Sequence, residues 1–180
     1  MFISKEQRPF LFKESTWHET LKLSLYAVFL FATPLILSHQ LIVGVIVNAI
    51  LIKAALNHKT KKVFILALIP SLGAIASGLI FGASTTQLVY LLPFIWVGNI
   101  ILMHLMRKLF MEGTVRYFST SIIAALAKTF FLFFSAMILF TFGLIPQSFL
   151  AAFSIVQLAT ALAGAAIVGF ARVKKGAYKE

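Results

Sequence analysis

Six polar or aromatic side chains interrupt otherwise apolar stretches of this 180-residue chain and could bind a small molecule. Amide groups can hydrogen-bond a solute, and aromatic rings can stack against it, which favours an uncharged or weakly charged, ring-bearing solute. Trp96 and Asn99 lie about 60° apart on a helix, so both can face one pocket. The predicted solute-binding residues are Asn48, Gln87, Tyr90, Trp96, Asn99 and Gln157. The competing interpretation is that these groups only hydrogen-bond between helices.

The acidic residues argue against catalysis and against ion-coupled pumping. The chain has no Asp and no Cys, and none of its five Glu residues lies inside an apolar run. Ion-coupled transporters generally use carboxylates within the membrane, and hydrolases need paired carboxylates or an activated nucleophile. The histidines are scattered, and no phosphate-binding loop is present. We therefore predict that the chain is not an enzyme and has no metal or cofactor.

His104 and Lys128 are the ionisable residues inside apolar runs whose placement needs an explanation, since Lys22 and Lys53 lie close to the ends of their runs. A charge at the centre of a membrane helix costs roughly 2.5–3.5 kcal/mol, and less near an end. We place Lys128 in the inner half of its helix and expect its ammonium to extend to the inner surface. Contact between Lys128 and a partner protein is the alternative. His104 is expected to hydrogen-bond inside the bundle or to face the inner headgroups.

The elements that must position these residues are six apolar runs of 16 to 23 residues, and the mean hydropathy of the chain is +0.98. Runs of this length predict membrane-spanning helices, because lipid cannot satisfy an open backbone. The sequence therefore predicts an all-α membrane protein of six transmembrane helices in a single bundle, over residues 1–180. Pro70 should kink or loosen the third helix. The runs are Leu21–Leu37, Leu41–Leu56, Val63–Phe81, Leu88–Met106, Ile122–Leu144 and Phe149–Phe170.

The positions of the sixteen Lys and Arg residues indicate how the chain is oriented in the membrane. Every second connection carries basic residues, whereas the others carry no charge. Basic loops stay on the cytoplasmic side, so we expect a multi-pass protein of the cell membrane with both termini inside. Residues 1–18 form a predicted interfacial segment and residues 171–180 a basic cytoplasmic tail. The net charge of +11 is expected to meet membrane lipid rather than nucleic acid.

Small residues at packing intervals could dock a partner membrane subunit. Ala74, Gly78 and Gly82 recur every four residues, and the last run is rich in Ala and Gly around Gly164. Such stripes allow helix backbones to approach closely. Packing inside this one bundle is the alternative interpretation.

Two segments resemble the substrate-binding S components of energy-coupling-factor transporters. The segment Pro70–Gly78 is similar to the family's P-x-x-G-A-x-x-G stretch. The segment Leu92–Asn99, followed by Met106-Arg107-Lys108, is similar to the family's fourth helix. The resemblance implies a bundle that binds a vitamin or similar nutrient from outside. It also implies as partners a transmembrane coupling protein and separate ATPase subunits.

The sequence therefore supports two hypotheses. In the first, the chain is a membrane-embedded substrate-binding subunit for nutrient uptake. In the second, it is a non-catalytic scaffold or assembly subunit, similar to the rod-shape-determining membrane subunit, whose polar residues only lock helices together. Fold analogy does not choose between them.

Overall fold

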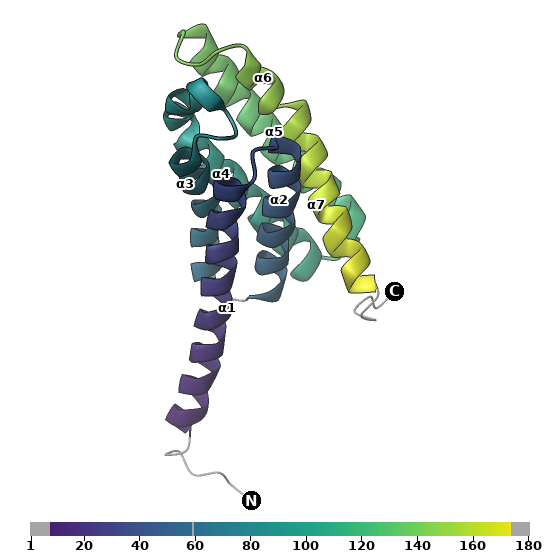
Figure 1. The fold of residues 1–180 in the computed structure, drawn as a ribbon. Coiled ribbons are helices and arrows are strands. Elements are labelled where there is room, and N and C mark those ends of the chain that lie inside the picture. Colours follow the sequence, from purple (N-terminus) through teal and green to yellow (C-terminus); the bar gives the residue numbers. More distant parts are fainter. Residues whose placement is uncertain (1–7, 59, 174–180) are drawn as a thin grey trace, which may run out of the picture.

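The chain folds into helices that run up and down a single bundle (Figure 1). The computed structural model describes residues 8–58 and 60–173, with side chains from residue 17 onward. Within these ranges every regular element is a helix, which confirms the predicted all-α class. The elements are α1 (Arg8–Ile36), α2 (Gln40–Asn57), η2 (Lys61–Ala67, a 3-10 helix), α3 (Ile69–Ser77), η3 (Gly82–Gln87, a 3-10 helix), α4 (Leu88–Leu105), η4 (Met106–Met111, a π-helix), α5 (Tyr117–Thr141), α6 (Ser148–Ala152) and α7 (Ile155–Val173).

Five helical stretches of the described chain are long and apolar enough to cross a membrane. This finding identifies a multi-pass membrane protein by length and composition. The five stretches match five of the six predicted runs and are Trp17–Ile36, Gln40–Asn57, Gly82–Met111, Tyr117–Thr141 and Ser148–Val173.

The predicted third helix, Val63–Phe81, is not continuous. It consists of η2 followed by the nine-residue α3, with Leu68 between them. Pro70 is the cause, because it has no backbone N–H to continue an α-helical ladder into the preceding turn. The free carbonyls at this junction are bound by side chains: Ser71 Oγ donates to Leu68 O at 2.8 Å and Asn99 Nδ2 donates to Ala67 O at 2.9 Å.

The two ends of the bundle differ in charge. One end, here called the basic end, holds η4, the start of α5 and the ends of α2 and α7. Contacts between distant segments define it: His58 Nδ1 lies 3.6 Å from Glu19 Oε1, and the Arg172 guanidinium lies 5.4 Å from the centre of the Phe110 ring. The opposite, charge-free end comprises residues 37–39, 78–87 and 142–147, none of which is Lys, Arg, Asp or Glu. In Figure 1 the charge-free end is at the top, and the N-terminal half of α1 extends beyond the other helices at the bottom.

Close backbone approach joins α2 to α7 on one side of the bundle. A Cβ atom on Gly164 would lie 2.8 Å from the amide nitrogen of Ala49 and 2.9 Å from the carbonyl oxygen of Val45. On the facing helix, a Cβ on Gly44 would lie 2.8 Å from Thr160 Cγ2. Each helix therefore presents a glycine to the other, and this contact brings Thr160 of α7 next to the middle of α2.

Candidate solute-binding cavity

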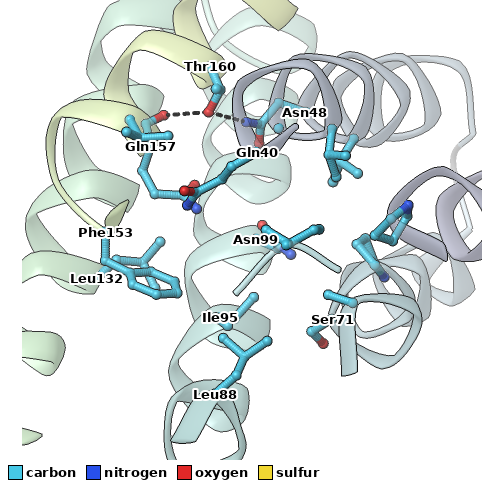
Figure 2. Close-up of a pocket in the computed structure, with 18 of the residues that line it drawn as sticks. Gln40, Asn48, Ser71, Leu88, Ile95, Asn99, Leu132, Phe153, Gln157 and Thr160 are labelled. Atoms are coloured by element: carbon cyan, nitrogen blue, oxygen red, sulfur yellow. Dashed lines mark hydrogen bonds between the residues drawn. The ribbon is translucent and has the colours of Figure 1, made fainter. Parts of the chain in front are cut away.

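A cavity of about 90 Å³ lies between α2, α4, α5, α7 and the junction of η2 with α3. Figure 2 shows that Asn48, Asn99 and Gln157 extend toward this space from different helices. Its lining is mixed, with apolar side chains such as Leu132 and Phe153. The polar residues that line it are Gln40, Asn48, Ser71, Asn99, Lys128, Gln157 and Thr160.

The deepest polar groups of the cavity lie at mid-height in the bundle. Lys128 is eleven residues from the start of α5 at Tyr117 and thirteen from its end at Thr141. Asn48 is eight residues from the start of α2 and nine from its end. A helix rises about 1.5 Å per residue, so both side chains lie within a few ångströms of their helix midpoints. Lys128 therefore lies almost at the middle of α5, only just within the predicted inner half of its helix.

Lys128 joins a hydrogen-bond network that connects three helices. Its Nζ donates to Asn48 Oδ1 at 2.7 Å, and Asn48 Nδ2 donates to Thr160 Oγ1 at 3.2 Å. The Thr160 hydroxyl donates in turn to the Gln157 carbonyl oxygen at 3.2 Å (Figure 2). Lys128 is only 2% exposed. Its ammonium does not extend to the inner surface, because the side chain faces α2 from the middle of α5 rather than from the end of the helix.

Asn99 and Ser71 form the wall of the cavity at the broken third segment. Asn99 is 3% exposed and holds the Ala67 carbonyl with its amide nitrogen. Ser71 Oγ accepts a 2.8 Å hydrogen bond from the indole nitrogen of Trp96. Trp96 itself does not line the cavity. The predicted pairing of Trp96 with Asn99 in one pocket is therefore realised only indirectly, through Ser71.

The remaining predicted binding residues divide between the cavity and the surface. Gln157 lines the cavity, but Gln87 and Tyr90 do not, and Tyr90 is 50% exposed. The reason is helical phase. The α4 residues on the cavity are Leu88, Ile95 and Asn99, and Tyr90 is about 200° around the helix from Leu88.

Four polar lining residues lie outside the predicted set: Gln40, Ser71, Lys128 and Thr160. Gln40 falls between the first two predicted apolar runs, and it is the first residue of α2. The position of Ser71 beside Pro70 could have identified it, because a helix broken by proline leaves free carbonyls that nearby hydroxyls bind. Lys128 had been assigned to the membrane surface.

The residues predicted to dock a partner do not form one helical face. α3 ends at Ser77, and Gly78 and Gly82 adopt left-handed backbone angles of +65° and +53°. The expected stripe with Ala74 is therefore broken, and Ala74 lines the cavity. Gly164 is buried against α2 of the same chain. A docking role for Gly78 and Gly82 stays a prediction.

His104 lies on the exposed surface near the end of α4, and its ring centroid is 6.3 Å from that of Phe64.

The fold is that of a helical multi-pass membrane protein by length and composition, with a cavity of mixed polar and apolar lining at mid-height. Comparison with protein-family models, with curated proteins and with solved structures finds no match to this chain. The cavity offers hydrogen-bonding amides and hydroxyls, one ammonium and an apolar wall, which suit binding of a small polar solute.

Proposed function

We propose that the chain is a membrane-embedded substrate-binding subunit for uptake of a small, nutrient-like solute. The observation that carries the proposal is the cavity, in which polar side chains from α2, α4, α5 and α7 meet at the centre of an apolar bundle. Polar and ionisable groups inside membrane helices are costly, and in membrane proteins they mark solute or ion pathways. The lining continues to Pro34 and Gln40, near the charge-free end, so the solute enters from that end.

The size of the cavity limits what it holds in the described conformation. Sites for drug-sized molecules are roughly 300–1,000 Å³. At about 90 Å³, this cavity accommodates a solute of a few heavy atoms. A vitamin-sized solute needs the aromatic side chains of the lining to move. Phe81 and Phe153 are candidates for that movement, since both line the cavity and their stacked rings have centroids 6.2 Å apart.

We further propose that the chain crosses the membrane six times, with the basic end in the cytoplasm. The third crossing is formed by η2 and α3 together. Seven residues of 3-10 helix rise about 14 Å and nine residues of α-helix about 13.5 Å. Their sum approaches the roughly 30 Å of hydrocarbon. Basic loops remain inside, which gives both termini a cytoplasmic location and the cavity an outward entrance.

The orientation can be measured with single cysteines, because the chain has none of its own. Gln147→Cys lies at the charge-free end and Thr114→Cys at the basic end, and both positions are exposed. In intact cells a membrane-impermeant maleimide should label the Gln147→Cys protein and should label the Thr114→Cys protein only after the membrane is broken. Labelling in the reverse order would contradict the proposed topology.

Energy for uptake comes, in this proposal, from separate ATPase and coupling subunits. The chain contains no phosphate-binding loop with which to hydrolyse ATP itself. The resemblance of Pro70–Gly78 to S components supports this arrangement. The coupling protein does not contact Gly164, because α2 covers that glycine within this chain.

A scaffold subunit is the second candidate function, and the Lys128–Asn48–Thr160 network favours it. These bonds join α5, α2 and α7, so they could serve only to lock the helices. Native mass spectrometry of gently purified protein separates the two functions. The uptake subunit should retain a small molecule that is lost in Asn99→Ala and kept in Tyr90→Ala, whose side chain lies away from the cavity. A ligand-free protein that co-purifies stoichiometrically with a larger complex would establish the scaffold.

A further inference from the structure

We infer that the cavity binds a monocarboxylate, whose negative group pairs with the Lys128 ammonium. The inference rests on the proposed solute-binding function and names the chemical class of the solute. It differs from the uncharged or weakly charged, ring-bearing solute that the sequence predicts, because the sequence alone does not bring Lys128 to the cavity.

Lys128 has no acidic counter-charge within the described part of the chain. The acidic side chains there lie at the basic end, where Glu19 is 3.6 Å from His58 and Glu112 is 3.6 Å from Arg107. None of the residues that line the cavity is Asp or Glu. A buried ammonium in apolar surroundings is stabilised chiefly by a nearby anion, and Asn48 supplies only one neutral oxygen. An anionic solute supplies the missing charge.

The neighbouring side chains suit the oxygens of a carboxylate. An ammonium has three N–H donors, and one of those of Lys128 goes to Asn48. Gln40 and Gln157 bring amide groups to the same lining. A carboxylate has about four acceptor sites, so it can receive hydrogen bonds from Lys128 and from an amide at the same time.

The charge and the volume of the cavity indicate a solute with one negative charge and a short apolar part. The lining contains one cationic side chain, so a dianionic phosphate would leave a net negative charge in an apolar bundle. A volume of about 90 Å³ holds a group of a few heavy atoms. Leu88, Ile95 and Leu132 form an apolar wall for a short alkyl chain. A small monocarboxylate meets all three conditions.

Matched pairs of probes test the inference on the purified full-length protein in detergent. The acids acetate, propionate, butyrate and hexanoate are each compared with the corresponding amide, which has a similar shape and no charge. Affinity is measured from the ligand-induced rise in the thermal unfolding midpoint. At least one acid should bind the wild-type protein about tenfold or more tightly than its amide, as expected for loss of a charge-assisted hydrogen bond.

Two variants assign the preference to Lys128. Lys128→Met keeps the length of the side chain and removes the charge, so the preference for acid over amide should disappear. Lys128→Arg keeps the charge and should retain the preference. Equal binding of acids and amides to the wild-type protein, no binding of any acid, or an undiminished preference in Lys128→Met would each overturn the inference. A retained molecule without a carboxylate, found by native mass spectrometry, would overturn it while leaving the solute-binding function intact.

Discussion

A methyl group added at Gly164 should separate α2 from α7, whereas the same change at Gly98 should be tolerated. The Cβ of Gly164→Ala would lie 2.8 Å from the Ala49 amide nitrogen and 2.9 Å from the Val45 carbonyl oxygen, both of them backbone atoms. Ordinary carbon contacts begin near 3.4 Å, so the helices must move apart by about half an ångström. At Gly98 the nearest atom is Leu132 Cγ at 3.0 Å, which belongs to a flexible side chain.

The expected cost follows from two opposing terms. Overpacking of this kind costs roughly 1–3 kcal/mol, and replacing a helical glycine with alanine gains about 0.8–1 kcal/mol. The contacts at Gly164 are to backbone atoms, which places its overpacking cost in the upper part of that range, about 2–3 kcal/mol, so Gly164→Ala should lose about 1–2 kcal/mol of unfolding free energy. The contacts at Gly98 are longer and to a side chain, so Gly98→Ala should change the unfolding free energy by less than about 0.5 kcal/mol. Unfolding of both variants by sodium dodecyl sulfate, in mixed micelles, measures the difference. A Gly164→Ala protein as stable as the wild type would refute the packing of α2 on α7 described here.

Three further changes probe the cavity wall and the broken helix. Asn99→Leu leaves the Ala67 carbonyl without its 2.9 Å partner and should lower the free energy of unfolding by about 1–3 kcal/mol. Amide hydrogen exchange at η2 should become faster, and unchanged exchange would contradict this. Trp96→Phe removes the donor to Ser71 and should lower the free energy of unfolding by about 1 kcal/mol. The protein should still retain its solute, since Trp96 does not line the cavity. Loss of the retained solute would place the indole in the site. Gly78→Ala forces a side chain into a +65° backbone angle and should lower stability by about 1–2 kcal/mol, and a neutral result would show that α3 does not end there.

The sequence predicted the helical class and five of the long helices because those features depend on local composition. Continuous apolar runs have one stable solution in lipid, and their ends are set by polar turns. The third run, Val63–Phe81, is the one that did not become a single long helix, and it shows the limit of this reasoning. Pro70 was correctly read as a disruption, but the junction of η2 with α3 also contains the hydrogen bond from Asn99 to the Ala67 carbonyl, 32 residues away in the sequence. No local pattern contains that contact.

The polar residues that line the cavity were predictable only as a set of candidates. Asn48, Asn99 and Gln157 were found because amides are rare in apolar runs, and all three line the cavity. Tyr90 was expected there for its chemistry, and the phase of α4 turns it outward. Lys128 was assigned to the surface because a lysine near a helix end extends there. Its position at the middle of α5 depends on where the helix begins, which is five residues before the apolar run.

A double-mutant cycle distinguishes a lysine that locks the helices from a lysine kept for a ligand. Asn48→Leu leaves the Lys128 ammonium without its 2.7 Å partner and should cost about 3–5 kcal/mol in the ligand-free protein. If Lys128 exists for a ligand, the double variant with Lys128→Met should recover most of that loss, because replacing a buried charge and its partner by apolar groups is often neutral or stabilising. If the network serves as a lock, the double variant should recover only the cost of the unpaired charge and should stay about 2 kcal/mol below the wild type, because it lacks both network hydrogen bonds. A neutral glutamine at position 128 could also bond Asn48 without a buried charge, so a locking role does not account for the ammonium. We therefore expect the ligand-free double variant to approach wild-type stability and to have lost its preference for carboxylates.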